Sequence, residues 1–402
     1  MNKALIEDSF LRIHNYIQRC EYKGYEFDDF LVSPMIRKLT LCNLFFQRVA
    51  IQIGKLCPIN LRPLIGVKKL NSTKARGFFA RGYLYYFLLS EDSTWLNRAL
   101  ESLNWLQMHY SRGFSGISWG NDFDFASGVG FFPRGLPTVV WTSLIAATFE
   151  MAYVITKHDT YLQVLKKSAD FIVSNLEYYQ DDDSICFFYA PGIRRLIHNA
   201  NLLGASTLLR AWKYIKNPTY YNLSKSAFHW TISHQNRNGS WYYGEGKEYR
   251  LRNWIDNFHT AYNIDSLGVG YEIGGEEVVP FSKLKKAYDY WTRNFFFNDG
   301  RPKYYPNRLY PIDIQCASQA IETLSKIAAR YFPEGLKLCE KILLWTVQNM
   351  QKMSGAFLYQ RRRFWLNNLE SIHWGQSTMF AALGTYLFYS SGRQSKYNIP
   401  YI

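Results

Sequence analysis

Acidic, basic and aromatic side chains gather in five stretches of this chain that are too irregular to be regular helices. The densest stretch follows Gln235 and carries Glu245, Asp256, His259 and Tyr262. A carboxylate, an imidazole and a phenol can pass protons to and from a bound substrate, so these four side chains are the first candidates for general acid/base catalysis. Asp256 and His259 are three residues apart at a predicted helix start, where they would share one face. A structural capping pair is the alternative for them.

The other stretches add three further acids and a set of candidate binding residues. Asp122 and Asp124 lie among aromatic residues in the first stretch, and Asp313 closes the fourth; helix capping is their alternative role. Aromatic rings stack on the apolar faces of pyranose rings, and arginine pairs with carboxylates through two parallel hydrogen bonds. We therefore expect substrate contacts, with core packing as the alternative for the buried ones, from Trp119, Tyr189, Arg194, Arg195, His198, Asn199, Trp241, Tyr243, Tyr305, Tyr310, Tyr359, Arg363, His373 and Gln376.

Metal and cofactor chemistry is not indicated. The sequence contains no helix with two metal-spaced histidines and no carboxylate-rich metal loop, so we expect neither a metal nor a cofactor. The six cysteines lie far apart without a CxxC pair, which is typical of small buried side chains in a reduced protein.

The candidate residues are separated by a repeating pair of helices. Five times an apolar helix ends in a short polar turn that begins at Ser90, Thr156, Ile215, Gly274 or Tyr331, and a second helix follows. These turns recur every 57 to 66 residues, which is long enough for two helices and a loop. The first helix of each pair, such as residues 138–154, is apolar on all sides, whereas the second, such as the one from Tyr161, is amphipathic.

An apolar helix belongs inside and an amphipathic helix outside, so the repeat predicts an all-α fold, an (α/α)6 toroid of helix hairpins. We expect a single domain over residues 1–402, with residues 1–70 as an N-terminal helical segment that packs on the toroid. This segment and the last helix, residues 377–389, would supply the sixth pair. Because the long loops all connect outer to inner helices, they should meet on one face and form a cleft there.

The charge and the aromatic content limit the classes of partner that this protein could bind. The net charge is +15, and aromatic residues make up 18% of the chain, with 31 tyrosines. This balance favours an acidic partner such as a uronic-acid polymer, a phosphorylated lipid carrier or an anionic membrane. We expect no nucleic acid, because there is no zinc-finger spacing, RNA-binding signature or long basic tail. A generally basic proteome would give the same charge.

No secretion signal or membrane span is evident. The N-terminus lacks a continuous apolar core, and no stretch reaches roughly 18 uncharged apolar residues. We expect a cytoplasmic protein. The stretch Leu39 to Cys57 is either a buried helix or a basic amphipathic helix in peripheral contact with the inner membrane. The oligomeric state stays open.

Two segments resemble a turn motif of other toroids. Residues 235–241, QNRNGSW, are similar to the Q-x-x-x-G-x-W motif of terpene cyclases and prenyltransferases, and residues 351–357, QKMSGAF, are a weaker copy. In those toroids the motif ties an outer helix to the next turn. The acidic signatures of cyclase chemistry are absent from this sequence, so the resemblance concerns architecture.

The loops themselves resemble a bacterial family from capsule, exopolysaccharide and O-antigen gene clusters. Members are toroids similar to the helical domain of D-glucuronyl C5-epimerases and to six-hairpin glycosidases. The β-rich part that precedes this domain in known epimerases is missing from this chain. The resemblance is carried by CPINLRPLIG from Cys57, RGFSGISWGNDFDF from Arg112, YAPGIRRLIHNANLLGA from Tyr189, YGEG and IDNFHTAYN between Tyr243 and Asn263, YYPNRLYPIDI from Tyr304, and HWGQSTMFAAL from His373.

This resemblance implies an enzyme of surface-polysaccharide biosynthesis that modifies an acidic glycan, as a polymer or linked to a lipid. The expected chemistry is proton abstraction at C5 of a uronate, which gives epimerisation or elimination. Glu245, His259 and Tyr262 would then transfer protons, and arginines would bind the carboxylate. Two alternatives are an inverting glycoside hydrolase, which needs two opposed carboxylates, and a non-catalytic glycan-binding or assembly factor.

Overall fold

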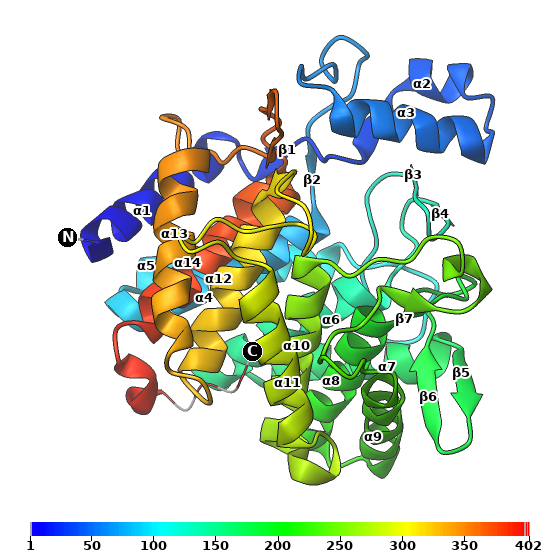
Figure 1. Cartoon of the computed structure of the whole chain (residues 1–402), viewed down its shortest axis with the longest axis vertical. Helices are drawn as coiled ribbons and strands as arrows, with labels where there is room; N and C mark the ends of the chain where they lie inside the picture. The colour runs from blue at the N-terminus through cyan, green and yellow to red at the C-terminus, as the bar shows by residue number, and fades with distance from the viewer. Residues whose placement is uncertain (1, 398, 400, 402) are drawn as a thin grey trace.

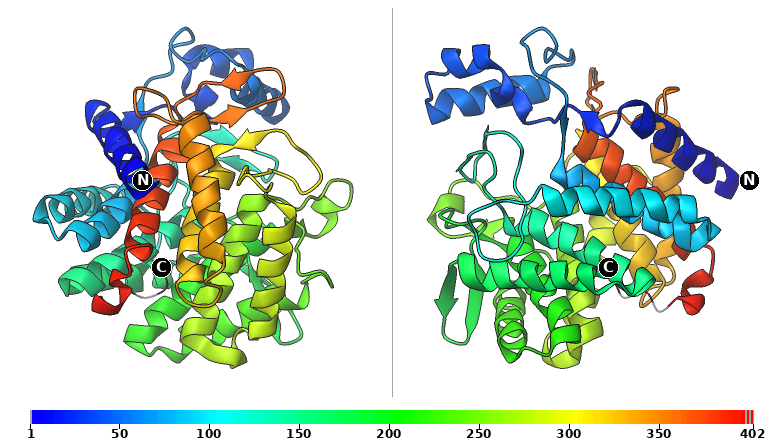
Figure 2. Two further views of the ribbon diagram at one scale, coloured as in Figure 1. Left: turned by 60° about the vertical axis from the view of Figure 1, so that its left-hand side comes forward. Right: turned by 180° about the vertical axis from the view of Figure 1, so that it is seen from behind.

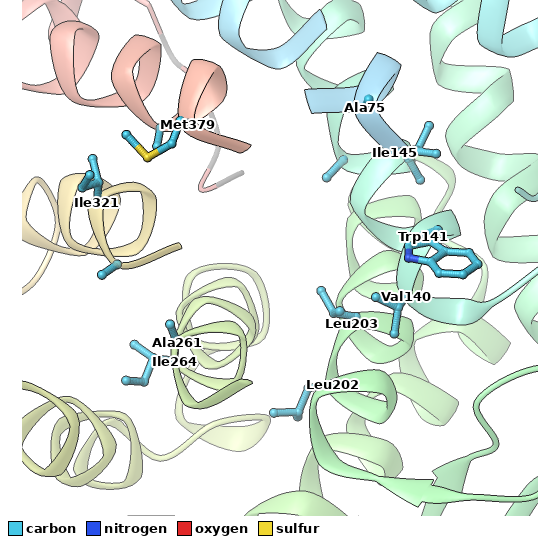
Figure 3. Packing of buried hydrophobic residues seen from close by; sticks show 14 of the residues in the cluster. Ala75, Val140, Trp141, Ile145, Leu202, Leu203, Ala261, Ile264, Ile321 and Met379 are labelled. Atoms are coloured by element: carbon cyan, nitrogen blue, oxygen red, sulfur yellow. The ribbon is translucent and has the colours of Figure 1, made fainter. Parts of the chain in front are cut away.

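A computed structural model describes residues 2–397, 399 and 401 and shows a ring of paired helices (Figure 1). Six inner helices surround the ring axis, and each packs on the next until α14 packs back on α4 (Figure 3). The inner helices are α4 (Thr73–Ser90), α6 (Val139–Thr156), α8 (His198–Ile215), α10 (Asn257–Gly274), α12 (Ile314–Ala328) and α14 (Thr378–Tyr389). The predicted (α/α)6 toroid is confirmed.

Each inner helix has an outer partner. The outer helices are α5 (Ser93–Met108), α7 (Asp159–Asn175), α9 (Pro218–Ser233), α11 (Phe281–Asn294), α13 (Gly335–Met350) and, beside α14, the N-terminal α1 (Asn2–Arg19). The sixth pair therefore joins the two ends of the chain, and α1 is an integral part of the ring.

Burial explains the two helix characters. Every residue of α12 is buried, whereas α7 buries one stripe whose members are three or four residues apart, including Tyr161, Val164, Leu165 and Ser168. Among the described residues, α6 is the one helix long and apolar enough to cross a membrane, although we had expected no such segment. Because 72% of it is buried in the ring, its inner position accounts for its composition.

The short turns lie at the end of the ring away from the long loops. Helices α4, α6 and α8 each end in a left-handed residue, Glu91, Lys157 or Lys216, and the next helix begins within three residues. Such a turn reverses the chain in the least space, so the inner helix and its outer partner are antiparallel neighbours.

The Gln–Gly motif works as predicted. Gln235 Nε2 donates to Gly239 O (3.1 Å) and to Lys283 O of the next outer helix (3.0 Å), and Gln351 Nε2 does the same with Gly355 O (3.0 Å) and Ser9 O (3.1 Å). Gly239 has φ +96°, and a Cβ there would lie 2.2 Å from Lys286 O. The turn thus needs glycine twice over, for its conformation and for its close approach to the neighbouring helix.

Short strands link neighbouring loops on the long-loop face. β7 (Leu196–Ile197) pairs with β8 (Gly244–Glu245), which joins the loops before α8 and α10. β9 (Ile312–Asp313), β10 (Gln360–Arg361) and β11 (Leu366–Asn367) form one sheet before α12 and α14, in the order β11-β10-β9. The remaining pairs are β1 (Lys23–Gly24) with β2 (Leu70–Asn71), β3 (Phe125–Ala126) with β4 (Phe131–Phe132), and β5 (Tyr178–Asp181) with β6 (Ser184–Phe187).

A segment between α1 and α4 extends beyond these loops. It contains η1 (Asp29–Val32), α2 (Pro34–Leu39) and α3 (Leu44–Leu56), which lie past β3 and β4 at the long-loop end (Figures 1 and 2). The remaining short helices are η2 (Lys247–Tyr249), η3 (Gly275–Glu277), η5 (Arg393–Lys396) and a π-helical turn, η4 (Ile372–Ser377), that leads into α14.

The ring interior is polar toward the short-turn end. Glu322 accepts hydrogen bonds from Arg81 (2.6 Å) and Lys326 (3.3 Å), and Lys326 also donates to Asp265 (2.6 Å). Tyr401 donates to Asp265 from the C-terminal tail (3.2 Å). The cavity among these side chains is about 40 Å³, which suits about three water molecules at ~10–15 Å³ each. It is too small for a sugar.

Candidate active site on the long-loop face

Each long loop ends at the N-terminus of an inner helix, and a polar side chain caps most of these helices. Ser72, Thr138, Asp256 and Asp313 accept backbone hydrogen bonds at the starts of α4, α6, α10 and α12, and Ser371 does so at η4. All of these N-termini surround the same end of the ring. Backbone N–H groups and the positive ends of helix dipoles therefore converge there.

Asp256 has two functions at the start of α10. Its Oδ1 accepts from His259 N (3.0 Å) as a helix cap, and its Oδ2 accepts from His259 Nδ1 (2.7 Å). Trp254 Nε1 also donates to Oδ2 (2.8 Å). With Nδ1–H held in this way, the Nε2 atom of His259 carries the free lone pair. This Nε2 has no hydrogen-bond partner among the described residues, and the side chain is 21% exposed. His259 is thus oriented as an acid/base.

Aromatic rings form a floor beside this imidazole. The Phe258 ring lies 4.0 Å from His259, 5.2 Å from Trp374 and 5.7 Å from Tyr304, as measured between ring centroids. Phe258, Tyr262 and Cys316 form a buried apolar cluster separate from the main core, with Trp374 and Tyr304 packed against it. The rings meet nearly at right angles, 86° for Phe258 with Trp374 and 76° for Phe258 with Tyr304. Phe258 is buried, so the partly exposed rings of Trp374 and Tyr304 are the apolar faces that a sugar could contact.

Several polar groups in the first turns of the inner helices and of η4 lack a protein partner. His373 Nδ1 and Asn199 Oδ1 are buried without a hydrogen bond among the described residues. The ammonium of Lys74 lies 4.5 Å from the Trp141 ring and has no ion pair in the part of the chain that is described. Burial, assisted by Lys74, lowers the pKa of His373 well below its usual range, so this imidazole is neutral. Unpartnered buried groups in one place indicate a ligand site.

Two acids reach this face from the segment between α1 and α4. Glu26 is buried and accepts from Ser371 Oγ (3.0 Å), and its other oxygen has no partner among the described residues. Asp28 is buried too, and its charge acts on the side chains of Tyr189 and Tyr359, which come from two different loops. Burial raises the pKa of Glu26 to about 7, which is the range of a general acid that works near neutral pH.

Glu26→Gln tests this elevated pKa. A carboxyl with a higher pKa in the folded state binds its proton more tightly there, so folding loses stability as the pH rises from 4.5 to about 7. Glutamine has nothing to ionise. The unfolding free energy of the variant relative to wild type should therefore rise over this pH range, by at most ~1.4 kcal/mol per pH unit, and stay level above it.

Urea unfolding at a series of pH values measures this difference. Glu101→Gln, at an exposed position on α5, is the matched control and should show no such trend. A difference between the Glu26 variant and wild type that is the same at acidic and neutral pH would contradict the assignment.

The structure places Glu245 and His198 away from the axis. His198 Nε2 donates to Glu245 (3.3 Å), and the His198 ring lies 5.0 Å from Trp230 and 5.8 Å from His234, both on the outer side of α8. Hydrogen bonding from His198 lowers the pKa of Glu245, and burial lowers that of His198. Among the described residues this pair makes no hydrogen bond or ring contact with the His259 floor, so Glu245 and His259, both first candidates for acid/base catalysis, belong to two separate groups.

The three arginines expected to bind a carboxylate are also peripheral. Arg194 forms two hydrogen bonds with Glu177 (2.9 and 2.7 Å), and Arg195 pairs with Glu248 (2.6 Å). Arg363 is exposed in the β10–β11 hairpin, beside Phe364. The cations near the floor are Lys74 and Lys55, the second of which lies 4.8 Å from the Phe27 ring.

Most other candidates are held in structural roles. Trp119 and Trp241 are buried core residues that donate to Leu106 O (3.0 Å) and Thr231 O (2.7 Å). Gln376 makes two hydrogen bonds with the backbone of Phe357 (2.8 and 2.9 Å). Asp124 accepts from Arg37 (2.8 Å) and from the backbone of Arg134.

Asp313 is likewise occupied, because it accepts from Gln360 (2.5 Å), from Trp374 (3.1 Å) and from the backbone of Gln315. Burial raises its pKa. Tyr262 OH accepts from Gln315 (3.0 Å) and lies deep in the ring. Asp122 differs from these groups: it has no hydrogen bond among the described residues, and burial raises its pKa.

Some of the tyrosines expected to bind substrate border the candidate site, and the others are packed in the core. Tyr243 stacks on Trp254 (4.5 Å, 13°) and contacts the His259 ring (4.6 Å), so it borders the candidate site. Tyr305 borders it next to Tyr304 (4.6 Å). Tyr359 is buried against Phe27, and Tyr189 and Tyr310 pack on the core.

Seven residues of the site were missed from sequence: Glu26, Asp28, Lys55, Lys74, Phe258, Tyr304 and Trp374. The first three lie in the segment before the ring, where no local pattern marks them. Lys74 was detectable as a charge in the first turn of an otherwise apolar helix. Among the described residues, no three His, Cys, Asp or Glu side chains are grouped as a metal site.

Comparison with known proteins identifies the fold. No protein-family profile and no curated protein matches the sequence. An unsaturated glucuronyl hydrolase specific for heparin is 12% identical over 96% of each chain, with a TM-score of 0.61. A sugar epimerase from a ruminal bacterium is 9% identical over 80% of this chain and 90% of its own (TM-score 0.62). A GH76 α-mannanase from Bacteroides thetaiotaomicron is 11% identical over 81% and 88% (TM-score 0.59).

Proposed function

We propose that this chain is a carbohydrate-active enzyme that transfers protons on a saccharide bound at the long-loop face. One observation carries the proposal: His259, oriented by Asp256 and with Nε2 free, lies beside an aromatic floor that the unpartnered imidazole of His373 also borders. The similar folds include a sugar epimerase and two hydrolases of sugars, which supports a carbohydrate as the ligand.

The arrangement suits proton abstraction from a carbon next to a carbonyl or carboxylate group. His259 Nε2 takes the proton, and the hydrogen bond from Nδ1 to Asp256 stabilises the imidazolium that forms. Lys74 stabilises the negative charge that develops on the substrate oxygen. Burial keeps His373 neutral, so its unpartnered Nδ1 is available for a hydrogen bond with the substrate.

We infer an acidic glycan of a surface-polysaccharide pathway as the substrate class. Lys74 provides a cation for a uronate carboxylate, and Lys55, whose pKa is lowered by burial, provides a further hydrogen-bond donor. The loop resemblance supports the pathway. Proton abstraction at C5 would then give the other epimer or, with a leaving group at C4, an unsaturated product. The arginines do not take part, because Arg194 and Arg195 are paired with glutamates outside the ring.

Hydrolysis is the second candidate function. Asp28 and Asp122 are carboxylates in the segments at the long-loop face that have no hydrogen-bond partner among the described residues, and burial raises the pKa of Asp122 as a general acid requires. A glycan-binding factor without catalysis would need none of these shifted groups, so the elevated pKa of Glu26 and Asp122 weighs against it.

Solvent exchange distinguishes these functions. The protein is incubated in D2O with uronate-containing bacterial polysaccharides and with neutral disaccharides, and proton NMR follows each sugar C–H signal. Loss of one C–H signal to deuterium supports proton transfer, and the product separates epimerisation from elimination. New reducing ends without exchange would replace the proposal with hydrolysis, and neither signal would favour a binding protein.

A further inference from the structure

Helix α3 has an apolar face that the protein leaves uncovered. Ile51 and Gly54 are buried, and Gly54 packs so closely on Phe30 that an added Cβ would lie 2.2 Å from the ring. The other side carries Phe45, Phe46, Val49, Ile53 and Leu56, all exposed, with Phe45 67% and Ile53 55% accessible. These positions recur at helical spacing, so they form one continuous stripe that points away from the packed side.

The exposed apolar residues concentrate in this part of the molecule. Of the 24 large apolar side chains that are exposed among the described residues, eleven lie between Met35 and Leu64. Three more, Phe364, Trp365 and Leu366, lie in the β10–β11 hairpin. Isolated exposed apolar side chains are ordinary, but a contiguous group of this kind marks an interaction surface.

The hairpin and α3 belong to one surface. Asn367 Nδ2 donates to Lys55 O (2.8 Å) at the end of α3. In the left view of Figure 2 the hairpin and the α2–α3 segment lie next to each other at the same end of the molecule. We call residues 34–69 together with residues 360–367 the basic apolar surface.

The charged residues of this surface are all basic. Residues 34–69 contain seven Lys or Arg and no Asp or Glu, and residues 360–367 contain three Arg and no acid. Two of these ten do not belong to the surface charge: Arg62 is buried and paired with Asp29 (2.5 Å), and Lys55 lies over the Phe27 ring at the candidate site. None of the other eight is buried. Arg37 is tied to Asp124 (2.8 Å), whereas Lys38 and Lys68 are exposed and have no ion pair among the described residues.

We propose that the basic apolar surface docks the protein on an anionic lipid bilayer. The apolar stripe of α3 enters the boundary between headgroups and acyl chains, and the surrounding Lys and Arg side chains meet the lipid phosphates. Trp365 and Phe364 are exposed on the same surface, and aromatic side chains favour the interface between membrane and water. Docking in this way places the long-loop face, with its candidate active site, close to the bilayer. The inference does not depend on the reaction proposed above.

Vesicle co-sedimentation of the full chain tests this inference. We expect binding to vesicles of equimolar phosphatidylglycerol and phosphatidylcholine, little binding to phosphatidylcholine alone, and loss of binding at high salt. Phe45→Ser/Phe46→Ser should weaken binding by about tenfold or more, because two exposed rings no longer enter the bilayer. Lys38→Glu/Lys68→Glu should weaken it to a similar degree.

Matched controls separate docking from general effects. Leu251→Ser/Met353→Ser removes two exposed apolar side chains elsewhere, and Lys286→Glu/Lys337→Glu reverses two exposed charges on outer helices. Both should bind as wild type does, and circular dichroism should show all four variants folded. Equal binding to neutral and anionic vesicles, or wild-type binding by the Phe45/Phe46 variant, would overturn the proposal. Loss of saccharide turnover by that variant in solution, with vesicle binding unchanged, would identify the stripe as a substrate lid instead.

Discussion

His259→Gln is expected to lower the rate of the proposed proton transfer by about a hundredfold to ten-thousandfold, which is the usual contribution of a general acid or base. Glutamine fills similar space but cannot take up a proton. The side chain is partly exposed and lies at the first turn of α10, so the fold should tolerate the change. Turnover of the saccharide that exchanges in D2O, followed by NMR, measures the effect.

Asp256→Asn distinguishes catalysis from capping at the same position. Asparagine caps a helix about as well as aspartate does, so α10 should remain stable. The amide cannot stabilise the imidazolium or fix the same tautomer, and turnover should fall by about a factor of ten or more. His158→Gln, an exposed histidine at the start of α7 on the short-turn side, should leave turnover unchanged. Full activity in the Asp256 variant would show that this residue acts only as a helix cap.

Glu322→Ala is expected to cause the largest loss of stability, about 3–5 kcal/mol, because it leaves the buried guanidinium of Arg81 without a counter-charge. Glu322 accepts from Arg81 of α4 and from Lys326 of its own helix, so it connects two inner helices across the ring. With the carboxylate gone, Asp265 is left as the acid bonded to Lys326, and Arg81 has no acid. Thermal and urea unfolding, followed by circular dichroism, measure the loss.

The pH dependence gives this prediction a second readout. Burial alone would raise the pKa of Glu322, but Arg81 and Lys326 outweigh it, so the pKa lies below its usual value of 4.5. Its contribution is therefore present above pH 4.5 and lost as the pH falls through the lowered value. Glu322→Gln and wild type should converge in stability in that acidic range. Glu177→Ala breaks an exposed pair with Arg194 and should change stability little.

The toroid could be predicted from sequence because each of its elements carries a local signal. The stretch that forms α6 is apolar on every side, and the one that forms α7 has a single apolar stripe, which distinguishes inner from outer helices without tertiary information. Gln235 and Gly239 recur in the weaker copy at Gln351 and Gly355, and each pair bonds to the next outer helix.

The position of a side chain around its helix was harder to predict. His198 and Asn199 are neighbours in the sequence, but His198 contacts Trp230 of the outer layer. Asn199 shares a face of α8 with Leu203 and Arg210, which line the axial cavity. One residue turns the side chain by about 100° around a helix, since there are 3.6 residues per turn. The sequence places both residues at the same junction between a loop and a helix. It does not show which of the two side chains faces the ring axis.

The remaining site residues depend on long-range packing. Glu26 reaches η4 through Ser371, which is 345 positions away in the chain. Lys55 comes from the α2–α3 segment, whose path over the loops no periodic pattern specifies. By contrast, Asp256 and His259 were found because both their spacing and their contact are local to the start of α10. The contact between Asp256 and His259 could therefore be predicted from sequence, and the residues around it could not.

A crystal structure of His259→Gln with the saccharide that exchanges in D2O tests the central claim most directly, because this variant should bind the substrate without converting it. We predict a sugar ring stacked on Phe258 or Trp374, with the reacting carbon facing residue 259 and polar contacts to Lys74 and Asn199. A saccharide bound beside His198 and Glu245, or anywhere away from the N-termini of the inner helices, would contradict the account.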